Sequence, residues 1–453
     1  MNIGNLEEYK PRVEVLRNPR VSGVPSTARL GASSLSLFAP FVFNKHDEAM
    51  QPRTVIMRIL YLLPSLNYNG AAKQALLLSR GLAKTCDIHV CALQDDGPWV
   101  ASFREAGAAV HSLNWVRPLD PLPLWRLHRL VAELKPDCIH VWRLPALRSL
   151  ALTARKLLSR CIVSQALPTD RLQPQLGRWD RWLLQRVAKI VAGGAGERDC
   201  LERLGFARER IAVVPPGVDI SQENSETNSR RIVCLGNLAD HKGFRDALRA
   251  ADYLTYTFPD LQLHIIGSGP GLESLQRYRK AAFYRDHMHF LGAHADAQSR
   301  LACADICWVP SLTATGRQVA LEAMAAARPV IASDLPHFRE IIVDGVSGLL
   351  VPPGDKTALA RRSRQLFLDD GLRRRLGEAA SARVRDHFAA KTFIGNCRAL
   401  YGAEPPCIFL QTAARDRFSI AAVETSRNNA LVNNTISSDR NREGALRSGR
   451  HVS

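Results

Sequence analysis

The side chains best placed to do chemistry lie in one stretch, residues 309–355, where an apolar run is followed by a short polar loop and a run of strong helix formers. Gly316 and Gln318 mark the expected start of this helix, and Glu322 follows in its first turns. Backbone N–H groups and the helix dipole converge at such a start, which therefore favours an anion or a small polar ligand. Since every α/β protein has several turns of this kind, a purely structural role is the alternative.

Two further short patterns favour an anion site. Gly236 and Asn237 follow an apolar run, and Lys242 comes next at an expected helix start, where its ammonium would meet a phosphate. Gly269 belongs to the glycine-rich turn GSGPG after another apolar run. Each pattern is weak by itself, because most lysines are simply solvated on the surface. Their occurrence together with the first stretch strengthens the interpretation as a phosphate site.

Apolar runs of strand length alternate with amphipathic helical patterns along most of the chain. Strands are expected at residues 57–64, 88–93, 109–113, 138–142, 161–165, 189–192, 211–214, 232–235, 261–266, 287–291, 306–309, 330–332 and 349–351. This order predicts an α/β protein with two Rossmann-like, doubly wound parallel-sheet domains facing across a cleft. We expect an N-terminal domain at 57–220 and a C-terminal domain at 221–402. Residues 1–56 and 403–453 lack a sustained period, so we expect a disordered extension, or a start codon placed too early, and a disordered tail.

Composition narrows the class of protein. Of the 453 residues, 46% are hydrophobic, and the formal net charge of +18 favours acidic partners such as nucleotide phosphates or anionic lipids. Nucleic acid is disfavoured, because no recognised binding module accompanies the charge. The ten cysteines lack the spacing of zinc ligands or of a disulfide framework, so we expect no metal site and a cytoplasmic location. No apolar run approaches the ~20 residues that a membrane-spanning helix needs.

Taken together, several motifs resemble the retaining glycosyltransferases of the two-Rossmann-domain (GT-B) type, family 4, also called glycosyltransferase group 1. The resemblance covers about residues 57–401 and rests on NGA at 69–71, VPPGVD at 214–219, Gly236 with Lys242 and Gly243, GSGP at 267–270, and LEAMA at 321–325 with RPVIASD at 328–334. It implies transfer of a hexosyl unit with retention from a nucleotide diphosphate-sugar to a glycan, glycolipid or other small acceptor. Neither a separate cofactor nor a metal ion is implied.

The resemblance also implies roles for individual residues. Glu322 would accept hydrogen bonds from the ribose hydroxyls, and Lys242 would neutralise the diphosphate as a catalytic residue. Gly70 would let the N-terminal loop approach the diphosphate closely. The other donor-binding candidates are Gly316, Gln318, Val319, Gly236, Asn237 and Gly269. His140 and, secondarily, Glu340 are candidates for catalysis, with a structural role equally open.

Three positions depart from the family pattern. The first of two family glutamates falls on Ala314, a common arginine falls on Asn237, and a second histidine falls on Trp142. Arg317 stands where small or apolar residues are usual, and we predict that its guanidinium replaces the missing arginine at the diphosphate as a catalytic residue. These departures leave open a catalytically silent nucleotide-sugar-binding or partner subunit. A sugar-nucleotide epimerase is a third interpretation.

The acceptor side is assigned to the first domain, where basic and aromatic residues are mixed on expected helices. These residues are Trp125, Arg126, His128, Arg129, Arg171, Arg178, Trp179, Arg181, Trp182 and Arg186. The mixture predicts a lipid-linked acceptor or peripheral contact with an anionic membrane, at its inner face. A solvated basic surface around core tryptophans explains the pattern equally well.

Overall fold

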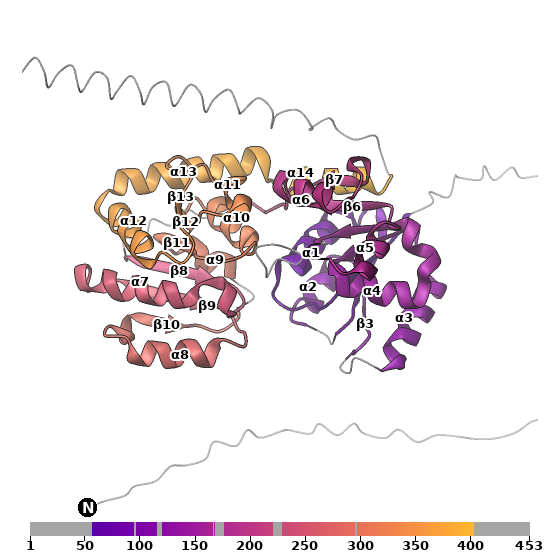
Figure 1. Cartoon of the computed structure of the whole chain (residues 1–453), viewed down its shortest axis with the longest axis horizontal. Coiled ribbons are helices and arrows are strands. Elements are labelled where there is room, and N and C mark those ends of the chain that lie inside the picture. Colours follow the sequence, from indigo (N-terminus) through magenta and orange to yellow (C-terminus); the bar gives the residue numbers. More distant parts are fainter. Residues whose placement is uncertain are drawn as a thin grey trace, which may run out of the picture. The chain divides into compact units, whose positions relative to one another are not determined.

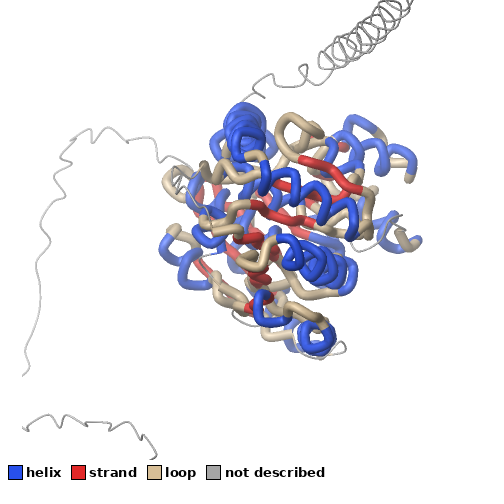
Figure 2. Tube along the Cα trace, turned by 90° about the vertical axis from the view of Figure 1, so that its left-hand side faces the viewer, coloured by secondary structure: helices blue, strands red, loops and turns tan. Residues whose placement is uncertain are grey.

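The computed structural model describes residues 57–94, 97–115, 120–165, 167, 176–220, 229–294 and 297–402. Within them the chain forms two parallel β-sheets, and helices enclose the strands (Figure 1, Figure 2). The predicted fold class, with two Rossmann-like parallel-sheet domains, is confirmed. The predictions of disorder for residues 1–56 and 403–453 fall outside the described residues.

The first sheet has seven strands in the order β3-β2-β1-β4-β5-β6-β7. The strands are β1 (Met57–Leu63), β2 (Cys86–Ala92), β3 (Ala109–Ser112), β4 (Cys138–Trp142), β5 (Cys161–Ser164), β6 (Lys189–Ala192) and β7 (Ile211–Val213). Both faces of the central strands are buried, which is why their sequences are continuous apolar runs. In register, Ile59 of β1 lies opposite Ile88 of β2 and Cys138 of β4.

Helices cover this first sheet on two faces, with a separate hydrophobic core under each. The helical elements are α1 (Gly70–Leu82), α2 (Val100–Glu105), α3 (Pro121–Leu134), α4 (Arg143–Ala154), η1 (Arg155–Arg160), α5 (Arg178–Leu184), α6 (Ala195–Arg203) and η2 (Arg208–Arg210). Leu78 of α1 and Phe103 of α2 belong to one core. Leu127 of α3, Leu147 of α4 and Leu183 of α5 belong to the other. The sheet is therefore the middle layer of a three-layer domain.

The second sheet repeats this architecture with six strands in the order β10-β9-β8-β11-β12-β13. Its strands are β8 (Arg231–Leu235), β9 (Gln262–Ile266), β10 (Met288–Phe290), β11 (Ile306–Val309), β12 (Val330–Ser333) and β13 (Leu349–Val351). Its helical elements are η3 (Asp240–Lys242), α7 (Phe244–Thr257), α8 (Leu272–Ala281), η4 (Arg285–His287), α9 (Ala297–Ala302), α10 (Arg317–Ala325), α11 (Pro336–Arg339), α12 (Lys356–Leu368) and α13 (Asp370–His387). The strand order reverses between β8 and β11, so the carboxyl ends of these two strands form the switch point where ligands bind in such sheets.

The last helix, α14 (Ala390–Leu400), returns to the first domain. It packs against α1, and Phe393, Cys397 and Tyr401 lie in the same core as Ile59 of β1. The sequence-based boundaries place residues 390–402 with the second domain instead, because periodicity identifies a helix but not the sheet that it covers.

The two crossings between the domains are hydrogen bonded to each other. The Val218 N–H donates to the Phe388 carbonyl at 2.9 Å, and the Ala390 N–H donates to the Val218 carbonyl at 3.0 Å. Val218 and Ala389 form an isolated parallel bridge. The chain therefore enters the second domain and leaves it at one point.

Candidate functional site

The start of α10 is shaped by a glycine in the left-handed region of backbone conformation. Gly316 caps the helix with φ +95°. A Cβ atom there would lie 2.7 Å from Cγ1 of Val309 and 3.0 Å from Oγ of Ser311, so a larger residue would push the loop off the end of β11. The absence of a side chain at Gly316 thus keeps the N–H groups of the first turn of α10 next to the carboxyl end of β11.

Lys242 lies beside this helix start on η3, which follows the neighbouring strand β8. The two loops are joined, because the Leu312 N–H donates to the His241 carbonyl at 2.8 Å. Gly243, with φ +71°, leaves no room for a Cβ atom against the Pro310 carbonyl. Burial lowers the pKa of the Lys242 ammonium to about 8. An anion that comes close to a desolvated ammonium of this kind stabilises its charged form.

The glycines that follow β8 and β9 pack two turns against each other. Gly236 has φ +151°, and a Cβ atom on it would lie 4.0 Å from Nζ of Lys242. Gly267 and Gly269 also have positive φ, and a Cβ atom on either would overlap the turn at Gly236 and Asn237. Gly236 therefore lies beside Lys242. Gly269 packs against Asn237, which is exposed.

Polar groups that the sequence analysis did not identify complete the helix start. His337 on α11 is buried, and its Nε2–H donates to the Thr315 carbonyl at 3.3 Å. Burial, and then the positive charge of Arg317, lower the pKa of His337 to about 3. The hydroxyl groups of Thr313 and Thr315 are buried and have no hydrogen-bond partner within the described residues. His337 stands four residues after the end of β12, and a single histidine at such a place has no sequence signal of its own, although the carboxyl ends of parallel strands share one edge of the sheet.

Glu322 lies further along α10 and is 2% exposed. Its Oε1 accepts hydrogen bonds from Nζ of Lys73 at 2.8 Å and from Nε2 of Gln318 at 2.9 Å. Oε1 of Gln318 in turn accepts from Nε2 of Gln74 at 2.7 Å. Lys73 and Gln74 belong to α1, so this network joins the two domains. Gly70 lies beside this network, because a Cβ atom there would be 3.6 Å from Cβ of Gln318, which is an ordinary van der Waals contact.

Arg317 also joins the domains, and this differs from its predicted contact with a diphosphate. One terminal nitrogen of its guanidinium donates to the Gly193 carbonyl at 2.6 Å, and the other donates to Oε2 of Glu340 at 2.8 Å. Oε1 of Glu340 accepts from the Gly196 N–H at 2.6 Å. Burial raises the pKa of the neighbouring Glu197, which accepts from the Gly193 N–H at 2.8 Å. Both terminal nitrogens of the Arg317 guanidinium thus donate to protein groups. The sequence indicates only that Arg317 stands at a helix start.

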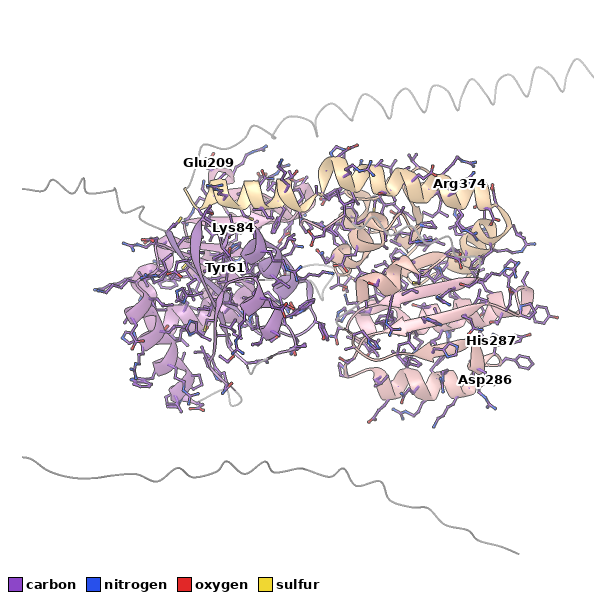
Figure 3. All side chains as sticks on the ribbon, turned by 180° about the vertical axis from the view of Figure 1, so that it is seen from behind. Tyr61, Lys84, Glu209, Asp286, His287 and Arg374 are labelled. Atoms are coloured by element: carbon purple, nitrogen blue, oxygen red, sulfur yellow. The ribbon has the colours of Figure 1, made fainter. Side chains whose placement is uncertain are left out.

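His140 does not lie with the other candidates. It is 1% exposed, its Nδ1 is 2.6 Å from the Tyr401 hydroxyl, and its Nε2 is 2.7 Å from Oγ of Ser164. Its ring stacks on Trp142 with centroids 3.7 Å apart, and the ring of Tyr61 meets both rings edge-on. Tyr61 lies inside the first domain (Figure 3). Burial lowers the pKa of His140 to about 3. A neutral imidazole with both nitrogens engaged in the core holds α14 to the sheet, and this favours the structural role that the sequence left open, while the catalytic role stays a prediction.

Val319 and Ala314 also differ in exposure. Val319, on α10, is partly buried and packs on the core under its helix. Ala314 is exposed in the loop between Thr313 and Thr315, and it offers no carboxylate to that loop.

An arginine- and tryptophan-rich surface lies on the first domain around α5 and η1. Two guanidinium groups lie over the ring of Trp182, those of Arg155 at 4.3 Å and Arg186 at 3.8 Å from its centroid. The surrounding groove, of about 690 Å³, is lined by Arg155, Arg178, Trp179, Arg181, Trp182 and Gln185. We call these six residues the Arg/Trp groove. Arg171 falls outside the described residues.

Membrane insertion by a helix has no support in the described part of the chain. None of its helices combines the length and the apolar character needed to cross a bilayer.

Two protein-family models match adjoining parts of the chain. The model described as "Glycosyltransferase Family 4" matches residues 68–222, and the model described as "Glycosyl transferases group 1" matches residues 218–383. Between them they include α1, the crossing at Val218, Lys242 and all of α10.

Individual proteins are similar over shorter stretches. A phosphatidyl-myo-inositol mannosyltransferase of Mycobacterium leprae is 32% identical over 215 residues, which make up 45% of this chain and 56% of that protein. The lipopolysaccharide core biosynthesis glycosyltransferase LpsD of Rhizobium meliloti is 26% identical over 275 residues, or 59% of this chain and 75% of the relative. The chain therefore spans about half the length of the mannosyltransferase that it matches.

Solved structures share the fold at low sequence identity. HepE of Anabaena, crystallised with UDP and glucose, has a TM-score of 0.66 and 18% identity, and the match covers 77% of this chain and 100% of that one. A sucrose-phosphate synthase from Thermosynechococcus elongatus has a TM-score of 0.63 and 19% identity, covering 76% of this chain and 98% of the synthase.

Proposed function

Because this chain belongs to the group 1, or family 4, glycosyltransferases, we propose that it transfers a hexosyl unit from a nucleotide diphosphate-sugar to a glycan, glycolipid or other small acceptor. One observation carries the proposal. On α10, the anion-binding start at Gly316 and the buried carboxylate of Glu322 are separated by about 9 Å along the helix axis, at 1.5 Å per residue. That spacing leaves room for a diphosphate at the helix start and a ribose at the carboxylate.

The charges of the site suit the departure of a nucleoside diphosphate. The ammonium of Lys242 and the N–H groups of the first turn of α10 face the place where negative charge develops when the glycosidic bond breaks. Groups that are fixed before the reaction stabilise such charge without reorganising, and this is usually the largest contribution to catalysis. We propose that transfer proceeds with retention through an oxocarbenium-like transition state. We also propose that the Lys242 ammonium and these N–H groups stabilise the leaving diphosphate without a metal ion.

The second candidate is a catalytically silent subunit that binds a nucleotide-sugar. The loop beside α10 carries Ala314 where the family has its first glutamate, and Glu322 is engaged with Lys73. A protein that binds the donor but lacks a group to orient the sugar would retain affinity and lose turnover.

For the acceptor, the Arg/Trp groove supports a lipid-linked molecule at the inner face of an anionic membrane. Guanidinium groups attract acidic headgroups, and tryptophan rings favour the interface between headgroups and acyl chains. Salt-sensitive flotation with vesicles containing anionic phospholipid is the expected result. Equal flotation with neutral vesicles would refute this assignment.

A donor panel tests the function itself. The protein is incubated with UDP-, GDP- and ADP-sugars, with and without acceptor lipids, and nucleotide release and the anomeric form of the product are measured. Acceptor-dependent release with an axial-to-axial or equatorial-to-equatorial outcome is expected for retention. Binding without release would favour the silent subunit, and conversion of the sugar without an acceptor would favour an epimerase.

A further inference from the structure

The contact between Lys73 and Glu322 suggests a function beyond joining the domains. Lys73 is on α1 of the first domain, whereas Glu322 is the carboxylate assigned above to the ribose. We propose that Lys73 is itself a donor-site residue: it neutralises Glu322 when the site is empty, and it moves to the diphosphate when ribose hydroxyls occupy that carboxylate. This inference rests on the proposed function and identifies a phosphate contact supplied by the first domain.

Arg317 and Lys73 differ in how firmly their partners hold them. Arg317 has both terminal nitrogens engaged, with Gly193 and Glu340. Lys73 is held by a single carboxylate, and its side chain is 28% exposed. Its flexible stem and compact ammonium suit it to act as a mobile point charge, whereas the planar fork of an arginine is fixed by its partners.

A ribose hydroxyl would compete with protein donors for the carboxylate of Glu322. One oxygen, Oε1, accepts from both Lys73 and Gln318. The carboxylate is 3% exposed, so a ribose hydroxyl that binds Oε1 displaces at least one of these donors. A released ammonium inside a partly desolvated site then lacks a counter-charge, and the nearest anion in the ligand is the diphosphate.

Lys73 lies close to the start of α10. Gly70, at the start of α1, lies against Gln318. The starts of α1 and α10 are therefore neighbours, and Lys73 is one turn into α1. The distance from Glu322 back to the start of α10 is about 9 Å along the axis. Rotation about the bonds of the four-carbon stem moves the ammonium away from Glu322 and toward that start.

A fixed salt bridge between domains is the competing explanation, and the two differ in how they depend on ligand charge. If Lys73 contacts the diphosphate, replacing it weakens binding in proportion to the phosphates on the ligand. If it only joins the domains, the same replacement changes the affinity for a nucleoside and for its diphosphate by the same factor.

The experiment compares the full-length wild type with Lys73→Met, Lys73→Arg and Lys84→Met. Lys84 follows the far end of α1 and is exposed, so its replacement removes the same charge from the surface (Figure 3). Calorimetric titration measures the Kd of uridine, UMP and UDP, and of the corresponding guanosine and adenosine ligands. Thermal unfolding shows that each variant is folded, and Lys73→Arg retains the charge should Lys73→Met fail to fold.

For the diphosphate that the wild type binds, Lys73→Met is expected to raise the Kd about 10- to 100-fold, as for a lost charge-assisted hydrogen bond. The Kd of the nucleoside stays the same or falls, because its ribose no longer competes with an ammonium for Glu322. Lys73→Arg retains most of the diphosphate affinity, and Lys84→Met behaves as the wild type.

Two outcomes overturn the inference, and they are distinguishable. A wild type that binds a diphosphate while Lys73→Met binds it equally well, or loses nucleoside and diphosphate affinity by the same factor, refutes the role of Lys73 and leaves the proposed function standing. A wild type that binds none of the nucleoside diphosphates rejects the proposed function, and the role of Lys73 falls with it.

Discussion

The two sheets share one architecture but differ in the polar residues of their central strands and of the loops that follow them. In the first sheet, His140 of β4 and Ser164 of β5 are within hydrogen-bonding distance of each other, and His140 also reaches Tyr401. In the second sheet, the loop after β11 carries the hydroxyls of Thr313 and Thr315, which have no partner in the described part of the chain, and Lys242 after β8 is desolvated. The first set is satisfied within the protein, whereas the second set is left for something else to satisfy.

This difference shows how a polar residue of a ligand site can be distinguished from a polar residue of the protein core. Both sets belong to central parallel strands or to the loops that follow them, where a sequence pattern does not separate a ligand site from a core. A buried polar group whose partners are all in the protein stabilises the fold, while a buried polar group without partners costs free energy unless a ligand supplies them.

Replacing Lys242 with Met is expected to have the largest effect. The change removes a positive charge from the place where the leaving diphosphate develops its charge, so kcat/KM should fall about 100- to 1,000-fold, or about 3–4 kcal/mol. Steady-state kinetics with the active donor measure it, and thermal unfolding serves as the control. Unchanged kinetics in a folded variant would mean that Lys242 is an ordinary structural lysine.

Replacing His140 with Phe is expected to affect stability and leave the chemistry intact. The Tyr401 and Ser164 hydroxyls lose a partner in the core, so the free energy of unfolding should fall by about 2–4 kcal/mol, while kcat at a permissive temperature stays within twofold. The folded pKa of His140, about 3, is below its ordinary value, so wild-type stability falls as pH drops below about 6.5. The variant should lack this part of the acid sensitivity in chemical denaturation curves. A large loss of kcat without loss of stability would restore His140 as a catalytic candidate.

Replacing Arg317 with Ala separates its two assignments. If the guanidinium joins the domains through Gly193 and Glu340, unfolding should become easier by about 1–2 kcal/mol and the Kd of a bound nucleoside diphosphate should change less than threefold. If it contacts the diphosphate, as the sequence predicts, affinity should fall by about 1.5–3 kcal/mol instead. Chemical denaturation and calorimetry on the same variant decide between these results.

The pH dependence of donor binding should reveal Lys242. Its pKa in the free protein is about 8, so the ammonium loses its proton as pH rises through that value, and diphosphate affinity should fall up to tenfold for each further pH unit. Because the same group has its ordinary, higher pKa in the unfolded chain, wild-type stability should rise with pH from about 8 to 10.5 relative to Lys242→Met. A diphosphate Kd that is flat across this window in the wild type would contradict the assignment.

The smallest effect is expected at the Arg/Trp groove. Replacing Arg155 with Ala removes one of the two guanidinium groups on Trp182, which should weaken binding to anionic vesicles by about 1 kcal/mol, or about fivefold. Vesicle flotation at two salt concentrations measures it, and donor affinity is the control. An effect on donor affinity of the same size would place the groove in the donor site instead.

Much of the fold follows from sequence, and less of the site does. Buried parallel strands are visible as continuous apolar runs, and Gly316 and Glu322 are visible because helix starts and carboxylates have distinct sequence signals. The partners of Arg317 and Lys73 are not visible, since they depend on how two domains meet. His337 was missed because one histidine after a strand has no signal of its own. For His140 the sequence left a catalytic and a structural role open, because it does not show whether a polar group is already satisfied.

The return of α14 to the first sheet has a consequence for how the protein can be divided. The first domain is discontinuous in the gene: it consists of the segment before the crossing at Val218 and the segment that begins at Ala390. A truncation that ends after α13 would expose the apolar surface formed by β1 and α1, whereas the second domain is a continuous insert that a single excision removes. Split versions of the protein should therefore be cut at both crossings, with residues 390–402 kept on the first-domain fragment.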